Sequence, residues 1–218
     1  EVLFTNNGPY FDDFLSYAAL GARSSEDHEH RSVVSSIDAP VGVKHGTDGD
    51  LVKGVNSVQA VQASHDLARY GKHIRTSGNA YAHLILRGSE QKGTNYDPAS
   101  LALASKLLRD GKRKLTNPAI LVDASHDNSL NGSGRDPKLQ KYVVRSVLEK
   151  ILDQREEYAL MRGFMIESFL REGKQPIREG VSRDGLSITD ACLGWDATEA
   201  MLRETADTVD TYRGRAST

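Results

Sequence analysis

The sequence predicts an α/β fold built on a parallel sheet, of the (β/α) barrel type. Apolar runs of strand length alternate along the chain with amphipathic stretches of helical length. The strand-length runs are continuously apolar, which is typical of a parallel sheet that is covered on both faces. Polar and charged residues follow several of these runs directly, and that is where active residues lie in a (β/α) barrel.

The individual elements follow from these two patterns. We expect strands at residues 2–4, 18–22, 41–44, 84–87, 119–124 and 163–168. Apolar residues at three- and four-residue spacing predict one helix through Leu139, Val143, Val147, Leu148, Ile151 and Leu152, and another through Met201, Leu202, Ala206 and Val209.

Local signals refine the ends and connections of these elements. Pro137 suits the first turn of the first of these helices, and Asp196 is the expected N-cap of the second. Residues 69–74, interrupted by Gly71, predict a small hairpin. Residues 131–134 and 178–185 have the composition of flexible loops that close over the mouth of a barrel.

Composition limits the class of protein. With 218 residues and a net charge of −2, the chain has the size of a single domain and no charge excess that would attract nucleic acid or a membrane surface. A single cysteine, Cys192, excludes an internal disulfide framework and fits a reducing cytoplasm. No apolar run approaches the roughly 20 residues of a membrane span. The chain begins with Glu1 rather than Met, so we expect residues upstream of it.

Candidate metal ligands follow three of the apolar runs. His126, Glu167 and Asp190 offer imidazole and carboxylate donors, which suit Mn, Fe, Co or Zn better than a soft metal. Three cations, Arg23, Lys44 and Arg87, end or follow other runs. Taken singly, such cations are most often solvated surface charges, and a histidine is more often structural than a ligand. Their common placement at strand ends instead favours an enzyme with a metal and a small, highly anionic substrate.

The motifs resemble those of class I 3-deoxy-D-arabino-heptulosonate-7-phosphate (DAHP) synthases. The resemblance rests on segments that occur in the family's order across nearly the whole chain. These segments are residues 21–26, 40–49, 76–79, 83–88, 95–97, 123–129, 166–168 with 172–173, and 187–195. This resemblance implies a (β/α)8 barrel of TIM type, of which residues 1–218 form one partial domain with about six strand–helix units.

The resemblance also implies an activity, which is the metal-dependent condensation of phosphoenolpyruvate with erythrose 4-phosphate in the shikimate pathway of aromatic amino acid biosynthesis. By similarity, the substrate-binding residues are Gly21, Ala22, Arg23, Lys44, Arg87 and His126. Lys44, His126 and Glu1 are the catalytic candidates. Glu1 and His126 would position or activate the attacking water. The metal ligands are His126, Glu167 and Asp190. A homo-oligomer is expected.

The chain also departs from the family pattern. Two strands that precede residue 2 in the family carry a Gly-Pro-Cys-Ser turn and a Lys-Pro-Arg-Thr segment, and neither motif occurs in these residues. Asp127 stands where a small residue is usual. We therefore expect no condensation by these 218 residues alone. Three readings stay open: part of a longer synthase, a divergent homologue acting on another aldehyde, and a non-catalytic phosphoenolpyruvate-binding pseudoenzyme or regulatory subunit.

Overall fold

A parallel sheet forms the centre of the molecule. The computed structural model describes residues 14–69, 71–111, 114–153, 155–177, 180–181 and 184–216. The sheet consists of β1 (Ala18–Leu20), β2 (Val41–Lys44), β5 (His83–Leu86), β6 (Ile120–Asp123) and β9 (Met161–Met165). These strands lie side by side in chain order, and every neighbouring pair is parallel. The predicted α/β class with a parallel sheet is confirmed.

Most of the predicted strand positions agree with the structure. The strand at residues 41–44 is found with the predicted bounds, and those expected at 18–22, 84–87 and 119–124 are shorter or shifted by one or two residues. The bounds expected for the last strand, 163–168, were wrong, because β9 pairs from Met161 and ends at Met165. The strand expected at residues 2–4 lies outside the described residues.

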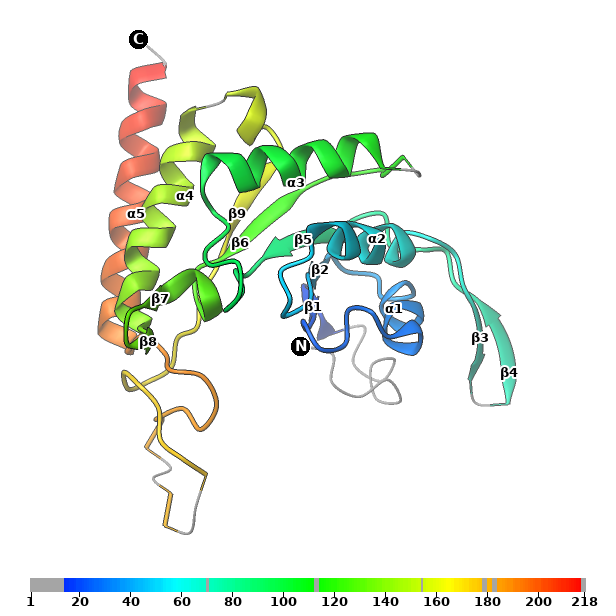
Figure 1. Ribbon diagram of the computed structural model, residues 1–218, viewed down its shortest axis with the longest axis horizontal. Helices are drawn as coiled ribbons and strands as arrows, with labels where there is room; N and C mark the ends of the chain where they lie inside the picture. Colours follow the sequence, from blue (N-terminus) through cyan, green and yellow to red (C-terminus); the bar gives the residue numbers. More distant parts are fainter. Residues whose placement is uncertain are drawn as a thin grey trace.

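Helices cover one side of this curved sheet. They are α1 (His28–Val34), α2 (Leu51–Val61), α3 (Pro98–Asp110), α4 (Gln140–Asp153) and α5 (Trp195–Ala216). Helices α2, α3 and α4 follow the outer side of the sheet, and α5 stands beside α4 (Figure 1). In the described part of the chain, no helix combines the length and apolar character that a membrane span requires.

Aspartate caps start the first three helices. Asp27, Asp50 and Asp97 each accept a hydrogen bond from a backbone N–H in the first turn of α1, α2 and α3. Such a cap satisfies a donor that has no partner within the helix, and its charge is favourable at the positive end of the helix dipole. The cap expected at Asp196 was wrong: α5 already begins at Trp195, so Asp196 lies inside its first turn.

The core lies between the sheet and these helices. Every residue of β1, β2 and β5 is buried, which explains why the strands read as continuous apolar runs. Val58 of α2, Leu101 of α3 and Val147 of α4 are fully buried against the sheet. Removing these side chains from water is the main favourable contribution to folding, and it fixes the strand ends that position the site.

Two hairpins extend from this framework. The first pairs β3 (Asp66–Arg69) with β4 (Lys72–Arg75), and it projects from the body of the molecule, as expected from residues 69–74 (Figure 1). The second pairs β7 (Leu130–Asn131) with β8 (Gly134–Arg135). Residues 131–134 were expected to be a flexible loop; Asn131 and Gly134 instead pair at the ends of β7 and β8, and residues 132–133 form the turn between them.

Asn79 links the two connections that precede β2 and β5. Its side-chain amide donates hydrogen bonds to the carbonyls of Ile37 and Ala39, at 3.0 and 2.8 Å, and its carbonyl accepts one from the N–H of Tyr81. Asn79 is buried and precedes β5, whereas Ile37 and Ala39 precede β2. Asn79 therefore links the two connections that lead into β2 and β5.

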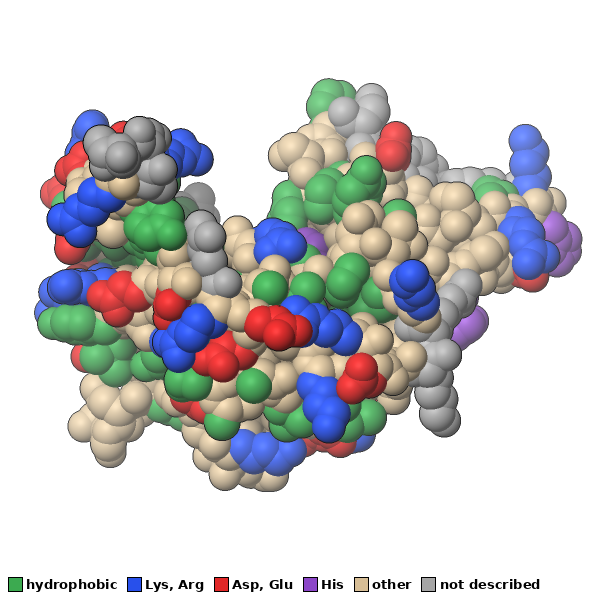
Figure 2. Space-filling model, turned by 90° about the horizontal axis from the view of Figure 1, so that it is seen from above, with side chains coloured by type: hydrophobic (Ala, Val, Ile, Leu, Met, Phe, Trp, Pro, Cys, Tyr) green, Lys and Arg blue, Asp and Glu red, His purple; other side chains and the backbone are tan. Residues whose placement is uncertain are grey.

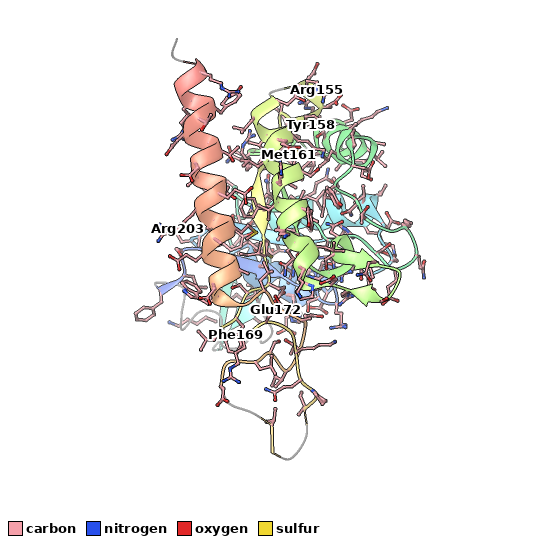
Figure 3. All side chains as sticks on the ribbon, turned by 90° about the vertical axis from the view of Figure 1, so that its left-hand side faces the viewer. Arg155, Tyr158, Met161, Phe169, Glu172 and Arg203 are labelled. Carbon is pink, nitrogen blue, oxygen red and sulfur yellow. The ribbon has the colours of Figure 1, made fainter. Side chains whose placement is uncertain are left out.

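The sheet continues past β9 by one parallel bridge, between Ser168 and Leu193. The chain after β9 turns back beside the start of α5, where Phe169 and Glu172 lie (Figure 3). The N–H of Phe169 donates to the carbonyl of Leu193, which holds this return segment in place. Within the described residues the sheet is open, and the closed barrel stays a prediction.

Candidate active site

The candidate residues gather where the parallel strands end. Lys44 is the last residue of β2, Arg87 follows β5 directly, and Asp123 is the last residue of β6. His126 begins the short 3₁₀-helix η3 (His126–Ser129) after β6, and Glu167 lies two residues beyond β9. Because the strands are parallel, their carboxyl ends meet at one edge of the sheet, and these side chains share that edge.

Three predicted metal ligands meet at this edge. One donor atom from each of His126, Glu167 and Asp190 lies within 4.8 Å of the other two. The Nε2 atom of His126 is 3.9 Å from Oε1 of Glu167 and 3.6 Å from Oδ2 of Asp190. His126 has a φ of 48°, the one positive φ outside glycine in the described residues. Backbone in this uncommon region is often found at functional sites.

Asp123 links the metal side of the site to Lys44. Its carboxylate is buried, 2.8 Å from Nδ1 of His126 and 3.3 Å from Nζ of Lys44. Burial alone would favour the neutral acid, yet the pKa of Asp123 is lowered, because His126 and Lys44 favour its charged form. A carboxylate behind one imidazole nitrogen is the usual partner of a metal-ligating histidine, whose other nitrogen faces the ion. Here that other nitrogen faces Glu167 and Asp190.

Gln140, the first residue of α4, fixes the backbone of Glu167. Its side chain accepts a hydrogen bond from the Glu167 N–H at 2.8 Å and donates one to the Glu167 carbonyl at 3.0 Å. Gln140 is fully buried.

Burial raises the pKa of the Glu167 carboxyl above its usual range, and the charge of Asp123 adds to this effect. A cation at this position would offset the crowded negative charge, so the donor set fits a divalent metal ion.

The anion-binding candidates lie beside this cluster. The Arg87 guanidinium is buried, and its Nη1 is 3.0 Å from Oδ2 of the equally buried Asp127. Arg135 of β8 pairs with the same carboxylate at 2.9 Å. Arg23 is exposed and lines a cavity of about 370 Å³ together with Asp127 and Arg135. Figure 2 shows basic and acidic side chains interspersed over one face of the molecule rather than gathered into a field of one sign.

The other predicted contacts are placed as follows. Gly21 is buried and Ala22 half-buried, in the turn directly after β1. Their strand is the neighbour of β2, which carries Lys44. Glu1 lies outside the described residues. The single cysteine, Cys192, is buried but does not belong to the metal group of His126, Glu167 and Asp190.

A buried polar network behind the site was missed by the sequence reasoning. The Nε2 atom of His45 accepts hydrogen bonds from the backbone N–H of Arg87 at 3.1 Å and from the Asn95 amide at 2.8 Å. The side-chain Oδ1 of Asn95 accepts a hydrogen bond from the Gly88 N–H, and the side-chain Oδ1 of Asn128 accepts one from the Asn95 N–H. The network therefore holds the backbone that presents Arg87.

Four further residues of the site were not among the predicted site residues. Asp123, Asp127, Arg135 and Gln140 act through neighbours that only the folded chain brings close. For Asp127, the one signal was its difference from the small residue usual in the resembled family. For Asp123, the signal was its place as the last residue but one of the strand predicted at 119–124.

The role of His45 gives a pH-dependent prediction. Burial chiefly, with the charge of Arg87, lowers the pKa of His45 below its ordinary value of about 6.5. The unfolded chain then binds a proton more readily than the folded one, so the free energy of unfolding should fall as the pH drops below about 6.5. His45→Gln should flatten this dependence. Urea unfolding at pH 7.5 and 5.5 measures it.

The exposed His73→Gln serves as the matched control and should keep the wild-type slope. An equal pH dependence in wild type and His45→Gln would contradict the neutral, hydrogen-bonded role of His45.

The chain is similar to known proteins over most of its length. Residues 1–203 match the family model described as the DAHP synthetase I family. The Tyr-sensitive phospho-2-dehydro-3-deoxyheptonate aldolase of Salmonella typhimurium is 36% identical over 211 residues, which cover 94% of this chain and 56% of the relative. The tyrosine-inhibited enzyme of Candida albicans is 38% identical over 225 residues, which cover 98% of this chain and 58% of the relative.

A solved structure is similar as well. The phospho-2-dehydro-3-deoxyheptonate aldolase of Francisella tularensis superimposes with a TM-score of 0.80 at 28% identity, over 93% of this chain and 57% of that one. The chain thus spans somewhat more than half the length of these relatives. The family match, which extends over almost the whole chain, shows that this chain belongs to the DAHP synthetase I family.

Proposed function

We propose that the protein takes part in the divalent-metal-dependent condensation of phosphoenolpyruvate with erythrose 4-phosphate, which yields DAHP. The observation that carries this proposal is the meeting of His126, Glu167 and Asp190 within 4.8 Å of one another, at the sheet edge that also presents Lys44 and Arg87. The names of the related enzymes support the same reaction.

The cations suit the first substrate. Phosphoenolpyruvate carries a carboxylate and a phosphate on three carbon atoms, and guanidinium groups bind both in bidentate fashion. Arg87 has five N–H donors, and the carboxylate oxygen of Asp127 that it contacts can accept only some of them. We assign Arg87, Lys44 and Arg23 to the substrate anion, with the backbone of Gly21 and Ala22 as further contacts. Arg23, on the wall of the 370 Å³ cavity, is the most accessible of the three cations.

His126, Glu167 and Asp190 would hold the metal ion, and Mn, Fe, Co and Zn fit these donors. A bound divalent ion would polarise the aldehyde of the second substrate. Asp123 lies 2.8 Å from Nδ1 of His126 and 3.3 Å from Nζ of Lys44, so its charge would hold both groups in place. Lys44 then acts as the proton donor or electrostatic stabiliser at the enol oxygen. By resemblance, Glu1 and His126 handle the water that attacks the second carbon of phosphoenolpyruvate.

We further propose that the sheet belongs to a (β/α)8 barrel. Its strands are all parallel and follow one another in chain order, and its candidate residues lie at the carboxyl ends of the strands. Active sites of such barrels occupy that end. The bridge between Ser168 and Leu193 continues the same order beyond β9.

A turnover experiment tests the proposed reaction. Residues 1–218 alone should not turn over, because they lack the Gly-Pro-Cys-Ser and Lys-Pro-Arg-Thr motifs. A chain that also carries these two motifs, supplied with Mn²⁺, phosphoenolpyruvate and erythrose 4-phosphate, should form heptulosonate phosphate and inorganic phosphate in equal amounts, because one water is consumed and the phosphate of phosphoenolpyruvate leaves. Chelation should abolish the reaction, and Glu167→Gln should reduce it strongly. Glu149→Gln, an exposed charge on α4, is the control and should match wild type. Binding of phosphoenolpyruvate with no release of phosphate would favour the non-catalytic alternative instead.

A binding experiment tests the anion site separately. Arg87→Ala should weaken phosphoenolpyruvate binding by about 2–5 kcal/mol, the usual cost of truncating one partner of a buried charged pair. Arg75→Ala removes an exposed arginine of β4 and should leave the affinity unchanged. Isothermal titration calorimetry measures both, with unfolding midpoints to verify folding. Equal affinities for a folded Arg87→Ala and the wild type would show that Arg87 does not contact the substrate.

A further inference from the structure

Arg135 joins two acids that come from different parts of the chain. Its Nε and Nη2 atoms each lie 2.9 Å from Oδ1 of Asp127, and its Nη1 lies 3.0 Å from Oδ1 of Asp190. Asp127 belongs to η3, whereas Asp190 lies 55 residues beyond Arg135 in the segment that precedes α5. The guanidinium fork therefore bridges two segments that no described strand pair connects.

One end of this bridge is firmly anchored. The Asp127 side chain is 2% exposed, and its second oxygen is held by Arg87 at 3.0 Å. The backbone of Arg135 is paired with Leu130 in the β7–β8 hairpin. An exposed ion pair contributes little, because it costs side-chain entropy and is screened by water. Here Asp127 is already fixed by burial and by Arg87, so forming this ion pair costs only the side-chain entropy of Arg135.

The other end of the bridge sets the orientation of Asp190. Arg135 takes Oδ1 of that carboxylate, while Oδ2 lies 3.6 Å from Nε2 of His126. Asp190 is one-third exposed and lies in a bend rather than in a helix or strand. Its carboxylate is therefore held by a side-chain contact rather than by regular backbone structure.

We propose that Arg135 is a positioning residue for the metal centre: anchored on Asp127, it holds one oxygen of Asp190 and so directs the other toward His126 and Glu167. This inference rests on the metal centre of the proposed function. It assigns to the hairpin a role that none of the sequence motifs indicated. Partners that orient metal ligands typically contribute about 10- to 100-fold to metal affinity.

The test is the Mn²⁺ affinity of the purified protein, measured by calorimetry. Arg135→Gln should weaken binding by about tenfold or more. Arg135→Lys should recover part of the loss, because an ammonium keeps the charge but cannot reach both carboxylates as a fork does. Arg203→Gln is the matched control: Arg203 lies on α5 and pairs with Glu199 of the same helix (Figure 3). It should bind Mn²⁺ as the wild type does.

The outcomes separate this inference from the proposed function. Wild-type Mn²⁺ affinity in a folded Arg135→Gln would overturn the positioning role. A wild-type protein that binds no Mn²⁺ would contradict the proposed metal centre. In that case a double-mutant cycle of Arg135→Gln with Asp190→Asn, read from urea unfolding midpoints, tests the pairing itself. Non-additive shifts support the hold of Arg135 on Asp190, and additive shifts overturn it.

Discussion

Two buried carboxylates at the end of β6 hold the candidate site together. Asp123 lies between Lys44 and His126, and Asp127 lies between Arg87 and Arg135. A buried charge without a partner is costly, and removing one member of such a pair is strongly destabilising. Each carboxylate therefore constrains the cations around it. The end of β6 and the segment after it therefore contact the ends of β2 and β5 and the β7–β8 hairpin through these ion pairs.

This arrangement connects the fold to the chemistry. Asp123 is shared by a candidate proton donor, Lys44, and a candidate metal ligand, His126, so both are set relative to one point. Gln140 fixes Glu167 from α4 in the same way, through its backbone. Because these supports are buried, the groups proposed to bind substrate are held in place by the fold itself. Such preorganisation is what makes charged groups effective in a site from which water is largely excluded.

The predictable part of the site depended mainly on strands. His126 and Glu167 could be grouped from the sequence, because each follows an apolar run that forms a parallel strand and the ends of parallel strands meet. Asp190 follows no described strand, and the resemblance to the family is what placed it in the group. Both bounds of β2 could be predicted from the sequence, since Pro40 precedes the strand and Lys44 ends its apolar run. Helices α1, α2 and α3 were not among the expected elements, so their aspartate caps were overlooked as well. Asp196 was wrongly chosen as a cap, because an aspartate near a helix start fits several positions of the first turn.

The supporting contacts were beyond the reach of sequence reasoning. Asn95 meets His45 across 50 residues and Asn128 across 33, and no local pattern predicts such pairs. Arg135 reaches Asp127 only because residues 130–135 form a tight hairpin instead of the expected flexible loop. Gln140 looked like an ordinary residue at a helix start, and its partner Glu167 lies 27 residues away. These contacts follow from the packed fold, which the sequence indicates only in outline.

The account can be tested most directly by locating a metal ion. A crystal of the protein soaked in Mn²⁺ and measured for anomalous scattering should show one strong peak among His126, Glu167 and Asp190, at about 2.0–2.3 Å from a donor atom of each. Asp123 should remain behind the His126 ring, and Arg135 should remain on the other oxygen of Asp190. A peak elsewhere, or an ordered structure with these three side chains apart, would contradict the central claim that the strand ends form one metal site.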